Sequence, residues 1–210
     1  ASWAAAQLAG RLGHKEDSIR FYEVSMNYKR LYDRRVNVMR ALDMKGEFRP
    51  LPKNFNPNQQ TRDYTEGNPW QYTFLVPHDV KGMIECFGGD KKFIERLDDL
   101  FANDLDKKYY EDNEDIEEEC LLGGYVHGNE PSHHVPYLYA WTSQPWKSQY
   151  WLREIMNRMY VNNIDGLHGN DDCGQMSAWY IFTAMGFYPV CPGSDQYVLG
   201  APYVPSCKLS

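Results

Sequence analysis

Three short acidic loops, each followed directly by an apolar segment, constrain the fold of this chain more than any other feature of its sequence. Each loop places a carboxylate beside Asn, Gly or Pro, and the segment after it has apolar residues at helical spacing. The loops are Glu66-Gly67-Asn68, Asn129-Glu130-Pro131 and Asn170-Asp171-Asp172. Polar loops and helices therefore alternate along the chain, and the pattern predicts a mainly α-helical fold.

The third loop is the most acidic of the three. Asp172 and Gln175 have the spacing of a capping box, in which the carboxylate accepts from free N–H groups of the first helical turn and the Gln side chain reaches back. Apolar residues recur at helical spacing from Met176, and Gly186 ends the helix. One Asp would satisfy the cap, so the second carboxylate and Asn170 suggest chemistry. A well-capped helix with solvated acids would explain the same residues.

Apolar spacing also predicts the other elements. Residues 14–43 contain neither Gly nor Pro and are apolar on more than one face, which indicates one long helix preceded by the end of another. Residues 47–69 hold four prolines and are typical of an irregular loop. The charge run at 111–119 fits a solvated loop or helix face. Helices are further expected at 70–76 (which also fits a strand), 80–87, 90–104 and 146–163, a turn and apolar helix at 125–139, and strand-like pieces at 197–199 and 203–204.

Composition narrows the classes of partner. The formal net charge of −7 argues against nucleic acid, because phosphate binding needs a basic face and the sequence has no stripe of Lys and Arg. No apolar run approaches the roughly 20 residues of a membrane-spanning helix. The five cysteines are odd in number and widely spaced, so they indicate neither a disulfide framework nor a zinc ribbon. The chain opens in what looks like the tail of a helix, which suggests a fragment of a longer protein.

Helices that pack as antiparallel pairs around an axis bring alternate loops to one end, where the three acidic loops could converge. Convergent carboxylates repel one another unless something divides them. A protonated carboxyl can protonate a leaving oxygen while an ionised one activates water, the pairing that cleaves glycosidic bonds. A hard cation such as calcium can also collect carboxylate and amide oxygens in the same pocket. Aromatic neighbours such as Trp70 suit the flat faces of a sugar, although they also fit a core.

Several histidines are candidates for binding. His127, His133 and His134 stand near the second acidic loop, but their spacing differs from the zinc-binding HExxH pattern. Satisfied structural histidines and hydrogen-bond donors to sugar hydroxyls are the interpretations that remain. His78 and Asp79, which follow a proline, fit a turn and helix cap as well as a substrate contact.

Three longer segments carry a resemblance to a known family: YTEGNPWQYTFLVPHD, HGNEPSHHVPYLY and GNDDCGQMSAWYIFTAMGFYPVCPGSDQYVLGAP. They resemble glycoside hydrolase family 92, the calcium-dependent exo-acting α-mannosidases. The likeness covers nearly the whole chain after about Asp63, and more weakly the helices before it. The motifs are long and stand in the right order, so the match is specific.

The resemblance implies a fold and a setting. It implies an (α/α)6 barrel of helical hairpins with catalytic loops at one end, short β pieces near the C-terminus, and normally a preceding β-sandwich domain. Residues 1–210 would be a single partial catalytic domain, the later part of the barrel, and we expect the isolated fragment to be inactive. The resemblance further implies a secreted, periplasmic or cell-envelope protein that acts with inversion on terminal α-linked mannose of a glycan such as an N-glycan, in the manner of an α-1,2-mannosidase.

The resemblance also implies roles for the acidic residues. Glu66 matches the general acid and Asp172 the general base that activates water, while Asp171 could share or replace the base. Glu130 remains an alternative to Glu66 as the acid. The candidate calcium ligands are Asn129, Glu130 and Asn170. The candidate substrate contacts are Trp70, Gln71, His78, Asp79, Glu130, His133 and His134.

Two other functions stay open on the sequence. The chain could be a carbohydrate-binding or scaffolding piece without activity of its own, because part of a barrel cannot close its pocket. It could also belong to a helical-barrel glycosidase with a different sugar specificity.

Overall fold

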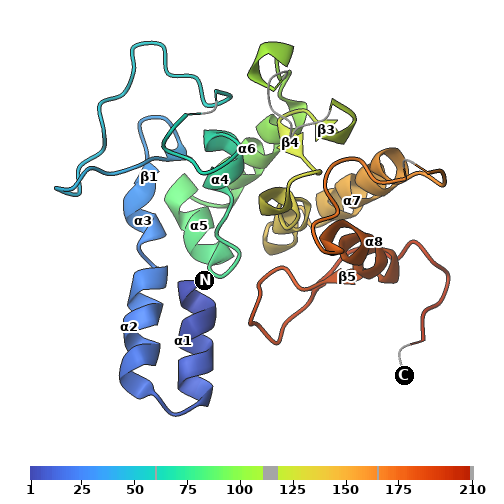
Figure 1. Ribbon diagram of the computed structural model, residues 1–210, viewed down its shortest axis with the longest axis horizontal. Coiled ribbons are helices and arrows are strands. Elements are labelled where there is room, and N and C mark those ends of the chain that lie inside the picture. The colour runs from blue at the N-terminus through green and yellow to red at the C-terminus, as the bar shows by residue number, and fades with distance from the viewer. Residues whose placement is uncertain (60, 111–117, 165, 209–210) are drawn as a thin grey trace.

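The computed structural model describes residues 1–59, 61–110, 118–164 and 166–208, and its chain is mainly helical (Figure 1). The expectation of a mainly α fold is therefore confirmed. The α-helices are α1 (Ser2–Arg11), α2 (Lys15–Ser25), α3 (Tyr28–Leu31), α4 (Pro69–Thr73), α5 (Val80–Phe87), α6 (Asp90–Ala102), α7 (Trp146–Met159) and α8 (Gln175–Met185). The 3-10 helices are η1 (Lys107–Tyr109), η2 (Glu118–Cys120), η3 (Glu130–Ser132) and η4 (Val135–Trp141).

In the described part of the chain, three short antiparallel strand pairs lie between the helices or beside them. They are β1 (Tyr32–Asp33) with β2 (Val38–Met39), β3 (Leu121–Leu122) with β4 (Tyr125–Val126), and β5 (Phe187–Tyr188) with β6 (Val198–Leu199). The strand expected at 197–199 thus exists, whereas residues 203–204 form a bend. Of the charge run, residues 111–117 lie outside the described residues.

The single long helix expected over residues 14–43 is wrong. The chain forms α2 and the short α3 and then turns into the β1–β2 hairpin, where Asn37 takes a left-handed φ of 55°. The buried Asp33 carboxylate accepts from Arg35 and from the buried Arg40, at 2.7 Å in each ion pair. Hydrogen bonds from these guanidinium groups hold the pKa of Asp33 well below its ordinary value although burial opposes them. Polar pairing therefore determines the backbone here, where apolar spacing suggested a helix.

The loop between β2 and α4 is irregular, as expected, and it is anchored at both ends. The Tyr64 hydroxyl donates to the Met39 carbonyl, and the Met39 N–H donates to Thr73 Oγ1 at 3.0 Å. These bonds attach the segment that precedes Glu66 to β2 and α4. The first acidic loop is thus held against the body of the fold.

One apolar core joins the central helices. The rings of Phe74, Phe87 and Phe93 pack together between α4, α5 and α6. On the other side, Trp179 of α8 is fully buried and stacks on Tyr160 at the end of α7. The α1–α2 hairpin, blue in Figure 1, extends away from this body. The core therefore holds the helices that follow the three acidic loops.

The remaining helices differ from the expectation mainly at their ends. Helix α6 buries the predicted apolar face, and α5 and α8 end at Gly88 and Gly186 in the left-handed conformation. Helix α7 ends at Met159, four residues before the predicted end. The second acidic loop and the segment after it form two 3-10 helices, each with Pro near its start, where a turn and an apolar α-helix were expected. No helix among the described ranges is long and apolar enough to cross a membrane.

We expect Asp33→Asn to destabilise the fold by about 3 kcal/mol, because it leaves the buried Arg40 guanidinium without its charged partner. The matched control is Asp17→Asn, which removes an exposed ion pair with Arg20 and should change stability by less than about 1 kcal/mol. Denaturant unfolding of the protein that carries this chain measures both values. Equal effects of the two substitutions would contradict the role assigned to the buried pair.

Candidate active site

The structure brings the three acidic loops together. Burial, a hydrogen bond with the Asp172 carboxyl and the charges of Asp172 and Glu66 raise the pKa of Glu130 to about 7. Glu130 Oε1 is buried and has no hydrogen-bond partner among the described residues. Two carboxyls can share a hydrogen bond only if one is protonated, so Glu130 holds a proton near neutral pH. Three carboxyls from distant parts of the sequence therefore share one site.

The first Asp of the third loop bonds the first turn of α8, whose N-cap position is Gly174, and the second Asp does not. Asp171 Oδ1 accepts from the Ser177 N–H at 3.0 Å and from the Ser177 hydroxyl at 3.1 Å. The predicted capping box of Asp172 and Gln175 is wrong, since Gln175 is the first residue of α8. Asp172 instead lies in a left-handed turn with a φ of 41°, and its residue is exposed. The bonding favours a structural role for Asp171 and leaves the Asp172 carboxyl available.

The first loop contains a capping box of its own. Asn68 Oδ1 accepts from the Gln71 N–H, and Gln71 Oε1 accepts from the Asn68 N–H, each at 3.1 Å. Gly67 is required here, because it has a φ of 62° and a Cβ would lie 1.9 Å from Gln71 Oε1. The Tyr72 hydroxyl donates to Glu66 Oε1 at 3.4 Å. Glu66 is thus held by the start of α4.

Two predicted substrate contacts next to Glu66 are buried. The Trp70 ring is covered by the guanidinium of Arg96, which lies 3.4 Å from the ring centroid. This packing favours a core role over an open platform for a sugar. Gln71 is also buried, but its Nε2 has no hydrogen-bond partner among the described residues. Gln71 therefore keeps an unused donor beside the first acidic loop.

The histidines of the second loop connect parts of the protein to one another. His134 Nε2 donates to the Phe74 carbonyl at 2.6 Å, which ties this loop to α4. His133 Nε2 donates to the His127 carbonyl at 2.8 Å, and its Nδ1 accepts from Gln175 at 3.2 Å. Burial lowers the pKa of His133 and of His134 to about 4, so both rings are neutral. Structural roles are therefore favoured over contact with a sugar.

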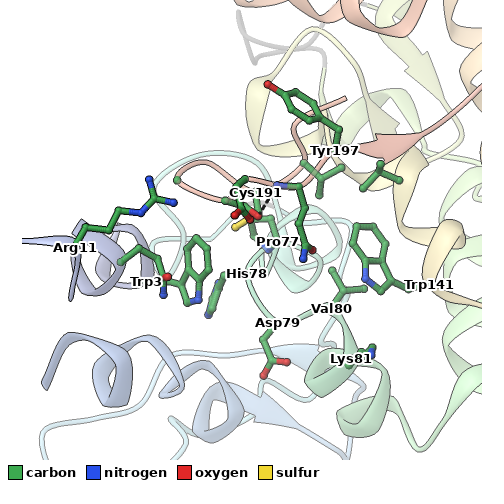
Figure 2. Close-up of a pocket in the computed structure, with 17 residues that line it drawn as sticks. Trp3, Arg11, Pro77, His78, Asp79, Val80, Lys81, Trp141, Cys191 and Tyr197 are labelled. Carbon is green, nitrogen blue, oxygen red and sulfur yellow. Dashed lines mark hydrogen bonds between the residues drawn. The ribbon is translucent and has the colours of Figure 1, made fainter. Parts of the chain in front are cut away.

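His78 and Asp79 lie apart from the acid cluster, at the cavity of about 420 Å³ in Figure 2. Trp3, Trp141 and Tyr197 also line this cavity, and none of the three clustered carboxyls does. His78 Nε2 donates to the Ser25 carbonyl at 2.9 Å. Asp79 is the cap of α5 and accepts from the Gly82 N–H and the Tyr28 hydroxyl. The interpretation of these two residues as a turn and cap is favoured.

The candidate calcium ligands are only partly assembled. Asn129 is the buried cap of η3, Glu130 is its first residue, and Asn170 is exposed. The described part of the chain contains no group of three or more His, Cys, Asp or Glu side chains that could hold a metal ion. The buried, unpaired Glu130 Oε1 beside a second carboxyl nevertheless fits a hard cation. Amide, carbonyl and water oxygens would have to complete the roughly six to eight ligands that calcium takes.

Sequence reasoning missed the contributions of two residues. Tyr72 donates its hydroxyl to Glu66, and the available signal was its place in the first turn of the helix that follows the first acidic loop. Gln175 was assigned to a cap, whereas its amide donates to His133 and to the Tyr188 hydroxyl. Both residues lie directly after an acidic loop. Residues in the first helical turn after an acidic loop therefore help to predict how the side chains of that loop are held.

Glycoside hydrolases use pairs of acidic side chains for catalysis, and the neighbouring carboxyls of this site fit that chemistry. Residues 1–210 match the model of the glycosyl hydrolase family 92 catalytic domain. The chain therefore belongs to glycoside hydrolase family 92.

Relatives with known structures agree with this assignment. The family GH92 α-mannosidase BT3965 from Bacteroides thetaiotaomicron is 44% identical with a TM-score of 0.80, and the match covers 94% of this chain and 24% of that protein. Its complex with mannoimidazole matches with a TM-score of 0.83. The inverting GH92 mannosidase BT2199 from Bacteroides thetaiotaomicron is 36% identical with a TM-score of 0.78, over 96% of this chain and 28% of that protein.

A fungal relative extends the comparison. A protein of Arthroderma benhamiae named "Uncharacterized secreted glycosidase" is 30% identical over 144 residues, which is 69% of this chain and 16% of that protein. The chain thus spans less than a third of the length of each of these relatives.

The raised pKa of Glu130 predicts how stability depends on pH. The folded pKa of about 7 lies above the ordinary value of 4.5, so the contribution of Glu130 to stability is present below pH 4.5 and is lost between pH 4.5 and 7. Glu130→Gln should therefore raise the thermal unfolding midpoint relative to the natural protein at pH 8, and change it much less at pH 4.5.

The measurement is made in a chelator, so that no cation competes with the proton. Glu95→Gln, which alters an exposed carboxylate of α6, is the control and should show no such difference between the two pH values. If Glu130→Gln changed the thermal unfolding midpoint equally at pH 4.5 and pH 8, the claim that the carboxyls crowd one another would be refuted.

Proposed function

We propose that the protein carrying this chain hydrolyses terminal α-linked mannose in glycans, in the manner of an α-1,2-mannosidase and with inversion. The observation that carries this proposal is the cluster of Glu66, Glu130 and Asp172 in a chain of family 92. The descriptions of two relatives support it, since one binds mannoimidazole and another is an inverting mannosidase.

The arrangement of the carboxyls supports one choice of acid and base. Inversion needs a general acid and a general base about 6.5–9.5 Å apart, with water between the base and the sugar. Glu130 and Asp172 are within hydrogen-bonding contact, which is too close for that pair. Glu66 acts on Glu130 through its charge only. Glu66 is therefore the better candidate for the acid opposite Asp172.

In the proposed reaction, Glu66 donates its proton to the glycosidic oxygen as the bond to the anomeric carbon breaks. Asp172 accepts a proton from the water that attacks the opposite face of that carbon. The Tyr72 hydroxyl donates to the Glu66 carboxyl and holds it in place. The bond from the Ser177 N–H to Asp171 fixes the turn that contains Asp172. Each acid is thus placed by its own helix start.

Calcium fits this proposal as a cofactor held by Glu130, with the amide oxygens of Asn129 and Asn170 as further candidates. When bound, it would supply positive charge that offsets the crowded carboxylates and offers a ligand position to sugar hydroxyls. Without calcium, the proton on Glu130 reduces the same excess of negative charge.

We further propose that the chain forms part of an (α/α)6 barrel in a longer protein with a preceding β-sandwich domain. The match to about a quarter of the longer α-mannosidase BT3965 supports the part of this proposal that places the chain in a longer protein. The name of the fungal relative is consistent with a secreted or cell-envelope location.

Asp172→Asn should lower kcat for an aryl α-mannoside about 10³-fold, because the base can no longer accept a proton from water. Asp171→Asn is the matched control on the neighbouring residue: the Asn side-chain oxygen can still accept from Ser177, so the variant should change stability by less than about 0.5 kcal/mol and leave most of the activity. Unchanged turnover of the Asp172 variant would remove the assignment of the base. Wild-type protein that cleaves another α-glycoside but no mannoside would contradict the substrate.

Calcium should raise the thermal unfolding midpoint of chelator-treated protein by stabilising the folded state that binds it. Glu130→Gln should abolish most of this increase, because it removes the buried carboxylate. Glu95→Gln should retain the increase. Calcium titrations followed by unfolding scans, without any activity assay, make the comparison, and an undiminished increase in the Glu130 variant would exclude Glu130 as a ligand.

A further inference from the structure

We propose that His133 and Gln175 are positioning residues that join the loop of Glu130 to the loop of Asp172 and set the separation of these two carboxyls. The inference rests on the proposed function, in which Asp172 acts on substrate beside Glu130. His133 follows Glu130 by three residues, and Gln175 follows Asp172 by three residues. The contact between their side chains is therefore a direct bridge between the two acidic loops.

His133 is fixed to the Glu130 loop from several directions. Its N–H donates to the Glu130 carbonyl at 3.0 Å, and its own carbonyl accepts from the Trp179 indole at 3.0 Å. Its Nε2 donates to the His127 carbonyl at 2.8 Å. The His133 residue is 2% exposed, so its ring has no freedom to turn toward solvent.

Gln175 is fixed to the Asp172 loop in the same way. Its N–H donates to the Asp171 carbonyl at 2.7 Å and lies 3.3 Å from the Asp172 carbonyl. Its side-chain amide donates one hydrogen to His133 Nδ1 at 3.2 Å and the other to the Tyr188 hydroxyl at 3.0 Å. Both hydrogens of the amide are therefore used, and the side chain is anchored on two sides.

The bonding determines the form of the His133 ring. A backbone carbonyl can only accept, so Nε2 must carry the proton, and the neutral ring then presents Nδ1 as an acceptor to the Gln175 amide. A ring that lacks this acceptor would leave one amide hydrogen without a partner. The His133 to Gln175 bond is thus a specific connection and not a general packing contact.

The two bonds of the His133 side chain can be removed one at a time. In His133→Asn the side-chain oxygen takes the place of Nδ1 and can accept from Gln175, while the bond to the His127 carbonyl is lost. In His133→Gln the side-chain amide takes the place of Nε2 and can donate to His127, while the acceptor for Gln175 is lost. Each variant loses one hydrogen bond, so similar losses of thermal stability are expected.

If the bridge positions the acids, His133→Gln should lower kcat for an aryl α-mannoside about 10- to 100-fold more than His133→Asn does, with KM nearly unchanged in both. Gln175→Met removes this bond and the bond to the Tyr188 hydroxyl, so it should lower kcat at least as much as His133→Gln does. The combination of His133→Gln with Gln175→Met should lose no more than Gln175→Met alone, because that variant already lacks the bridge. Equal kcat in the two His133 variants, or losses that multiply in the combination, would overturn the proposal.

Hydrogen exchange separates this proposal from the proposed function. Backbone exchange of residues 169–174 should become faster in His133→Gln and Gln175→Met, and stay near the natural rate in His133→Asn. If the protein hydrolyses no mannoside but this exchange pattern holds, the proposed function fails and the bridge stands. If exchange is the same in all three variants, the bridge is refuted whatever the activity.

Discussion

The repulsion between carboxyl groups that meet at one place is the constraint on which the rest of this structure depends. Glu66, Glu130 and Asp172 come from three loops far apart in the sequence, and burial together with the two neighbouring carboxyls raises the pKa of Glu130 to about 7. A proton on Glu130 relieves the repulsion, and a divalent cation would relieve it further. Such an arrangement costs stability, so it persists only because the surrounding bonds hold each loop in place.

Those bonds follow a common plan in which each acidic loop is fixed by the helix that begins after it. The capping box of Asn68 and Gln71 holds the first loop, and the bond from the Ser177 N–H in the first turn of α8 to the Asp171 carboxylate holds the third. The second loop begins η3 and is tied through its neutral histidines to α4 and α8. Local hydrogen bonds at helix starts thus fix the position of each loop, and the apolar core fixes the positions of the helices.

The sequence predicts the helices with strong apolar spacing and the meeting of the acidic loops, because both depend on patterns that are regular along the chain. It does not predict the β1–β2 hairpin, since the ion pair of Asp33 with Arg40 forms only when the chain folds back. Nor does the sequence predict which Asp bonds the first turn of α8. The spacing to Gln175 indicates Asp172, whereas the left-handed turn at Asp172 leaves Asp171 to accept from Ser177. Likewise, burial decides that His133 is structural, and spacing carries no information on burial.

The most direct test of the account is an experimental structure of the protein that carries this chain with a mannose-like inhibitor such as mannoimidazole bound. The account predicts that the inhibitor ring lies among the three carboxyls, with Glu66 and Asp172 on opposite sides of the anomeric carbon and Glu130 beside Asp172. An inhibitor bound instead in the cavity lined by His78 and Trp141, or a ring with Glu66 and Asp172 on the same side, would contradict it.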